Sequence, residues 1–169
     1  MAATISVQEV NGGGAGTPST VTAAVLCTAD ETAPGTNHPM VKPAAGTNRS
    51  YWKHFYLNAD TSPTGTINNI KWYTDGTIGW TGITLFAATD ATYTPATGTE
   101  STTGDDYSHT ALADASGLTS AAPLSVPGTI SNPTTGKISE YVIVQADLST
   151  SAVGGALAAE TVTWRYDES

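Results

Sequence analysis

The side chains best suited to chemistry in this sequence are its histidines, its single cysteine and its carboxylates. His38, His54 and His109 are far apart, and no His-x-His or His-x-x-x-His pair places two metal ligands on one strand or helix. The run from Asp105 to His109 gathers acids and a histidine in one loop. It lacks the alternating acids and the glycine of a helix-loop-helix calcium site. We therefore expect a solvated loop there, with a bound cation as the alternative.

Nucleophilic and phosphate chemistry also lack their sequence signatures. No Gly-x-Ser-x-Gly is present, and the glycine run Asn11–Gly16 is not followed by Gly-Lys-Ser/Thr. Cys27 lies in an apolar run without a neighbouring base, so we expect a buried, inert thiol, and a lone cysteine excludes an intrachain disulfide. The carboxylates show no pairing typical of glycosidases. We predict that the protein is not an enzyme and has no catalytic residue, metal site or cofactor.

Aromatic side chains offer a second kind of chemistry, which is recognition. Trp72, Tyr73 and Trp80 lie around an Asp-Gly turn and could stack on sugar rings, whereas large aromatics in small β domains more often belong to the core. A third alternative is a protein interface. The predicted interface side chains are apolar or aromatic: Ile5, Val7, Trp52, Tyr56, Trp80 and Tyr107.

The length and charge of the chain limit the number of domains and the classes of partner that the protein can have. A chain of 169 residues is long enough for one domain with a sizeable core, so we predict a single domain over 1–169. Only 12% of residues are charged and the net charge is −9, which disfavours binding to nucleic acid or to an anionic membrane. No stretch is long and apolar enough for a signal peptide or a membrane span, so we expect synthesis in the cytoplasm without export.

The elements that must position these residues are strands, because the dominant pattern is period-two alternation interrupted by Gly, Pro, Asn and Asp. We predict seven to nine strands and no long helix, in an all-β antiparallel sandwich of immunoglobulin-like or jelly-roll-like type, with a barrel as the weaker alternative. The predicted strands are Thr4–Val10, Thr20–Cys27, Tyr51–Asn58, Thr66–Tyr73, Thr77–Trp80, Ile83–Ala88, Ile138–Asp147 and Glu160–Tyr166.

The connections carry their own predictions. Asp75-Gly76 supplies the positive φ angle of a tight hairpin between Thr66–Tyr73 and Thr77–Trp80. Three prolines in Asp30–Ser50 predict an extended surface loop. Residues 1–18 and 89–133 are expected to include extended arms, and Leu112–Leu118 a single helical turn.

Face assignments follow from the alternation. The strand Tyr51–Asn58 has two faces: one carries Tyr51, Lys53, Phe55 and Leu57, and the other carries Trp52, His54 and Tyr56. Because both faces hold aromatics, this strand is either central or presents one face to a partner. In the next strand we predict Ile67 and Asn69 on one face, and Ile70 and Trp72 on the other.

Two stretches carry a resemblance to known proteins. Residues 68–80, Asn-Asn-Ile-Lys-Trp-Tyr-Thr-Asp-Gly-Thr-Ile-Gly-Trp, and the terminal 160–168, Glu-Thr-Val-Thr-Trp-Arg-Tyr-Asp-Glu, resemble small virion structural proteins of tailed viruses. The resemblance spans most of the chain and is sharp only at these stretches. It implies a β-sandwich that coats or cements a capsid or sits in the tail, and it carries over no catalytic residue.

These observations lead to one functional expectation with two alternatives. We expect a non-enzymatic decoration or cement protein on the capsid surface of a virion, made in the host cytoplasm. Its partner would be the major capsid protein or another virion structural protein. It would be a homo-oligomer, with a trimer as one arrangement, and would bind neither nucleic acid nor membrane. The alternatives are a tail-tube or other tail-associated protein, and a carbohydrate-binding sandwich on a host-facing appendage.

Overall fold

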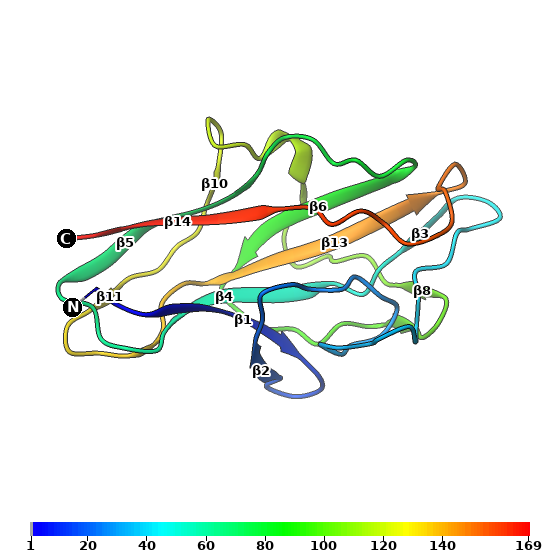
Figure 1. The fold of residues 1–169 in the computed structure, drawn as a ribbon. Coiled ribbons are helices and arrows are strands. Elements are labelled where there is room, and N and C mark those ends of the chain that lie inside the picture. The colour runs from blue at the N-terminus through cyan, green and yellow to red at the C-terminus, as the bar shows by residue number, and fades with distance from the viewer. Residues whose placement is uncertain (1) are drawn as a thin grey trace.

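A computed structural model describes residues 2–169, which are 42% strand and 2% helix. The predicted all-β sandwich is confirmed, because antiparallel sheets pack against each other (Figure 1). The strands are β1 (Ile5–Asn11), β2 (Thr17–Thr20), β3 (Thr47–Arg49), β4 (Lys53–Ala59), β5 (Thr66–Thr74), β6 (Ile83–Asp90), β7 (Gly98–Thr99), β8 (Thr103–Gly104), β9 (Ala113–Asp114), β10 (Leu124–Ser125), β11 (Ile130–Ser131), β12 (Gly136–Lys137), β13 (Tyr141–Ser149) and β14 (Val162–Glu168). One 3₁₀ turn, η1 (Ala115–Gly117), confirms the helical turn predicted within Leu112–Leu118.

The larger sheet, called the large sheet below, has the strand order β2-β1-β4-β13-β6-β9, with β12 against β4 and β3 against β13. Strand β4 is central, as the aromatics on both its faces allowed, and pairs with β1 on one side and β13 on the other. The longest pairing joins β13 to β6 over eight residues of each strand. Strand β1 begins and β14 ends at the same end of the sandwich (Figure 1).

The smaller sheet, called the small sheet below, is built around β5. Trp72 lies opposite both Leu124 of β10 and Trp164 of β14, and Ile67 lies opposite both Ile130 and Glu168. Because a strand has two edges, β10 and β11 must share one edge of β5 and β14 must occupy the other. Strand β14 therefore forms one edge of the small sheet, and β10 and β11 form the other.

The main core lies between the two sheets. Strands β13 and β6 alternate, so Val142, Val144 and Ala146 face inward beside Leu85 and meet Trp72 from the small sheet. Trp72 is only 1% exposed. Burial of this apolar surface is the main free-energy gain that stabilises the sandwich.

A bulge in β5 changes the predicted faces of this strand. Residues 165 and 167 of β14 lie opposite Lys71 and Asn68, so β5 contains one extra residue there. Asn69 takes a φ of 50°, which asparagine tolerates better than most residues. As a result Ile67 and Ile70 both point into the core, and the prediction that they face opposite ways is wrong.

Two predicted strands are absent from the described structure. Of Thr20–Cys27, only Thr20 belongs to a strand, and Val25 is 49% exposed, because residues 21–46 form a long loop instead. Thr77–Trp80 forms no strand either. Gly76 does take a positive φ of 91°, yet the turn leads from β5 in the small sheet to β6 in the large sheet, so the predicted hairpin does not form.

Within residues 2–18 and 89–133, where arms were expected, several stretches pair with or pack on the two sheets. Strand β1 pairs with β4 along Ile5–Val10, and Asn11–Gly16 is the turn that returns the chain into β2. Within residues 89–133, β10 and β11 join the small sheet. The part from 91 to 112, called the cover segment below, packs on the outer face of the large sheet.

Candidate functional site

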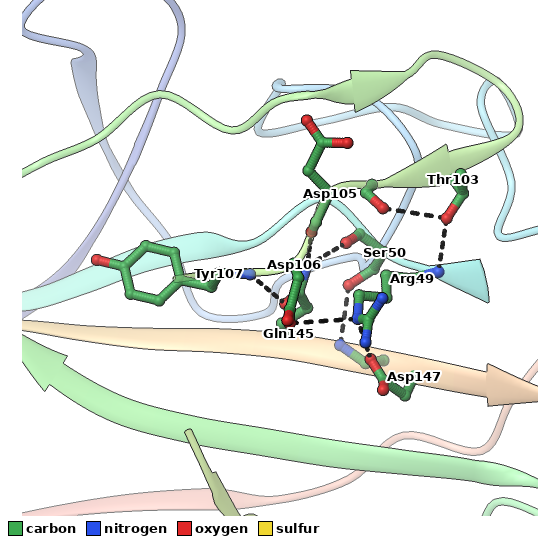
Figure 2. A network of polar contacts seen from close by, with 10 residues as sticks. Arg49, Ser50, Thr103, Asp105, Asp106, Tyr107, Gln145 and Asp147 are labelled. Carbon is green, nitrogen blue, oxygen red and sulfur yellow. Dashed lines mark hydrogen bonds and ion pairs between the residues drawn. The ribbon is translucent and has the colours of Figure 1, made fainter. Parts of the chain in front are cut away.

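The outer face of the large sheet holds a network of polar contacts that joins the sheet to the cover segment (Figure 2). Gln145 on β13 is 1% exposed and lies beneath the cover segment. Its amide nitrogen donates to the backbone oxygens of Ser50 at 2.9 Å and Asp105 at 2.7 Å, and its amide oxygen accepts from the Tyr107 N–H at 3.2 Å. One buried side chain therefore ties the cover segment to the sheet.

Arg49 lies at the rim of this network. Its Nε is 3.2 Å from a carboxylate oxygen of Asp147 and 3.4 Å from one of Asp106 (Figure 2). Burial raises the pKa of the Asp147 carboxyl, and the Arg49 charge opposes that shift. Two open, adjoining depressions of about 300 and 310 Å³ meet at Asp147 and the Phe86 ring. This groove offers charged hydrogen-bonding groups beside an aromatic face.

The predicted acidic loop does not assemble its ligands. The Asp105 carboxylate accepts from the Thr97 hydroxyl at 2.8 Å, Asp106 faces Arg49, and the His109 ring packs 5.3 Å from the Tyr107 ring. Within residues 2–169, no group of three histidine, cysteine or acidic side chains comes close enough to hold a metal ion.

A buried histidine marks the aromatic part of the same face. His54 on β4 is 1% exposed, and its ring lies 4.7 Å from that of Tyr93 and 5.4 Å from that of Tyr141. Burial lowers the pKa of His54 to about 4, although the Asp90 charge acts in the opposite direction. The imidazole is therefore neutral near pH 7 and belongs to an aromatic cluster rather than to a charged site.

The predicted interface residues separate into two groups. Trp52, next to β4, and Tyr107, in the cover segment, are 4% and 3% exposed and pack on each other with ring centroids 5.2 Å apart, and Tyr56 is 9% exposed. These three side chains therefore offer little surface. Ile5, Val7 and Trp80 are half-buried and pack against the main core. An interface role remains a prediction that concerns mainly these last three.

The proposed sugar-stacking trio is not a single platform. Trp72 is in the core, whereas Tyr73 lies on the outer face of the small sheet. Trp80 is half-buried, and its indole N–H donates to the Ala158 oxygen at 2.8 Å. Cys27 is 1% exposed, and burial raises the pKa of its thiol, in agreement with the prediction of a buried cysteine.

Sequence reasoning missed a buried ion pair on the core side of the large sheet. Lys53 Nζ lies 2.7 Å from Glu9 Oε1, and the two side chains are 1% and 0% exposed. Lys53 also donates to the Glu31 backbone oxygen at 2.6 Å, and Asn11 donates to Glu9 at 2.7 Å. A signal was present, because Glu9 follows Ile5 and Val7 on the core face of β1, and Lys53 precedes Phe55 and Leu57 on the core face of β4.

The ion pair fixes the long loop 21–46, called the anchored loop below. Glu31 belongs to this loop, and its backbone oxygen accepts a hydrogen bond from the Lys53 ammonium. Elsewhere in the loop, Thr28 donates its N–H at 2.8 Å and its hydroxyl at 3.0 Å to the backbone oxygen of His38. The loop is thus held without strands, and it presents Val25 and Val41 at 49% and 37% exposure.

Comparisons with protein families, with curated proteins and with solved structures find no match to this chain. The fold and the surfaces therefore define the class, which is an antiparallel β-sandwich with one covered outer face. None of the helical residues among 2–169 forms a helix of the length and apolarity that crossing a bilayer requires.

Proposed function

We propose that the protein is a non-enzymatic structural protein of a virus particle, a decoration or cement protein that binds the capsid lattice and stabilises the shell. Its partner would be the major capsid protein. It would be made in the host cytoplasm and reside on the capsid surface. The resemblance of residues 68–80 and 160–168 to virion proteins supports the class, and the low charge content suits contacts that are apolar and hydrogen-bonded.

The observation that carries the proposal is the anchored loop. A strand-free segment of this length in a compact domain usually has a binding role. Here it is held by a buried lysine and by paired bonds from Thr28, so it loses little conformational freedom on binding. Exposed Val25 and Val41 supply apolar surface on it. A rigid, weakly charged epitope of this kind fits repeated contact with a protein lattice.

The test is rebinding to particles from which the protein has been stripped. We expect full-length protein to rebind and to restore the heat resistance of the shell, because binding to the closed lattice stabilises it by mass action. Val25→Asp and Val41→Asp should weaken rebinding, because each places a charge in an apolar contact. Val153→Asp is the matched control, since Val153 is 63% exposed on a different loop. Equal rebinding by all three variants would contradict the assignment to this loop.

Copy number and position decide between the capsid and the tail. A map of the native particle should place hundreds of copies on the shell. A few copies along the tail would instead support the tail-associated alternative. Particles that are equally stable without the protein would reject the cement role.

A carbohydrate-binding module remains the second candidate, because of the groove at Phe86. An aromatic face next to an Arg49–Asp147 pair is the arrangement that stacks on a sugar ring and hydrogen-bonds its hydroxyls. Glycan-array binding that is lost in Phe86→Ala, with the fold retained, would favour this candidate. Retained binding in that variant would place the glycan elsewhere.

A further inference from the structure

Strand β14 leaves one backbone edge open. The Thr74 N–H donates to the Leu118 oxygen, and the Ile70 oxygen accepts from Val126, so both residues direct these groups away from β14. In an antiparallel pair, opposed residues either bond each other or both point away. Val162, opposite Thr74, and Trp164, opposite Trp72, therefore direct their N–H and C=O groups outward.

The other end of the strand gives the same alternation independently. Thr66 and Ser169 exchange two backbone hydrogen bonds, at 2.7 and 3.0 Å, so Ser169 faces β5 and Glu168 faces outward. Counting back along β14 places Tyr166 outward as well. Outside the pairing with β5, the backbone groups of Val162, Trp164 and Tyr166 make no hydrogen bond to another described residue.

This edge differs from the other edges of the sandwich. Strand β14 is seven residues long and contains neither proline nor glycine, whereas the edge strands β2 and β9 of the large sheet have four and two residues. The cover segment packs on the outer face of the large sheet, and among the described residues β5 is the only strand that pairs with β14. An open edge of this length is a template for another strand.

The charges on β14 indicate which strand fits. Arg165 and Asp167 are both exposed on the outer face of the small sheet, two residues apart. Asn69 donates to the Asp167 carboxylate at 2.7 Å and so holds it on that face. If a second β14 lies antiparallel about Tyr166, each Arg165 stands opposite the other copy's Asp167. The neighbouring register about Arg165 would instead oppose two arginines, which is unfavourable.

We propose that two copies of this chain associate through β14, antiparallel about a two-fold axis at Tyr166. The two four-stranded small sheets then form one continuous sheet. Trp164, Tyr166 and Glu168 of each copy supply roughly six main-chain hydrogen bonds across the axis, and two Arg165–Asp167 pairs fix the register. The dimer does not depend on the virion role.

The experiment is a charge exchange measured by analytical ultracentrifugation on the full chain. Arg165→Asp and Asp167→Arg should each raise the dimer dissociation constant at least tenfold, because each creates two like-charge oppositions. The double variant R165D/D167R should recover the dimer. An equimolar mixture of the two single variants should form a heterodimer, since the two acids of one chain then face the two arginines of the other. This rescue is specific to the proposed register.

Controls separate this result from loss of fold or a general charge effect. Lys71→Glu reverses a charge on the same face of the neighbouring β5 and should leave the dissociation constant unchanged. Circular dichroism and thermal melting check that every variant is folded. A full-length chain that remains a monomer at about 1 mM would overturn the proposal. So would a dimer that neither single reversal weakens, or folded single variants that fail to pair when mixed.

Discussion

The buried pair of Glu9 and Lys53 should make stability strongly dependent on having both partners. Lys53→Met leaves the Glu9 carboxylate, 0% exposed, without its cation, and one of its oxygens already lacks a hydrogen-bond partner. Breaking a buried pair from one side typically costs about 3–5 kcal/mol. We expect a loss of that size in the free energy of unfolding. Glu9→Gln should cost a similar amount, because it leaves the buried Lys53 ammonium without its carboxylate partner.

The double variant E9Q/K53M should lose much less than the sum of the two. It removes both charges and keeps an amide oxygen near Asn11, so the main remaining cost is the Glu31 oxygen that loses its donor, about 1–3 kcal/mol. Urea denaturation of the four chains gives the coupling directly. A double variant as unstable as the two single losses added together would refute the reasoning, because it would show that the charges act independently.

Three further results are expected. Trp72→Ala should lower the free energy of unfolding by about 3–5 kcal/mol, and Trp164→Ala by less, because Trp164 is only half-buried; equal losses in thermal melts would contradict this order. Asn69→Gly should be tolerated and Asn69→Val should destabilise in the same assay, because the bulge needs a positive φ. Burial lowers the pKa of His54 to about 4, so between pH 6.5 and 4 the unfolded state binds more protons than the folded state. The free energy of unfolding should therefore fall as the pH drops through this range, and His54→Phe should flatten that part of the stability profile measured with urea.

The long strands were predictable because their alternation extends over many residues. The sequence pattern placed β4, β5, β13 and β14 to within a few residues, and it identified β4 as a strand with aromatics on both faces. The strands β7 to β12 have only two residues each, which is too short for a period to be read. Their pairing depends on contacts with distant parts of the chain.

The conformation of the Asp-Gly turn was predictable, but the sheet to which the following strand belongs was not. Gly76 takes the positive φ that Asp-Gly indicates, yet the partner of the strand before it is chosen by packing across the whole sandwich. The same limit applies to Thr20–Cys27, where β-branched residues favour a strand and the anchored loop forms instead. The bulge at Asn69 was missed because strict alternation was assumed through it.

The candidate surfaces were the least predictable part, because exposure depends on which layer covers which face. Trp52 and Tyr107 have the composition of an interface, and the structure uses them to hold the cover segment on the large sheet. Sequence pattern alone cannot distinguish an aromatic that meets a partner from one that meets a loop of its own chain. The open backbone edge of β14 has no sequence signature, since it is defined by which strand lies outermost.

The covering of one outer face determines where partners can bind. In a two-sheet sandwich each sheet usually keeps one face for solvent or partners, but here the cover segment buries His54 and Gln145 on the outer face of the large sheet. That face contributes rigidity and, at its rim, the groove beside Phe86. The two proposed contacts, the anchored loop with a lattice and β14 with a second copy, use different segments of the chain, so each can be tested by variants that leave the other unchanged.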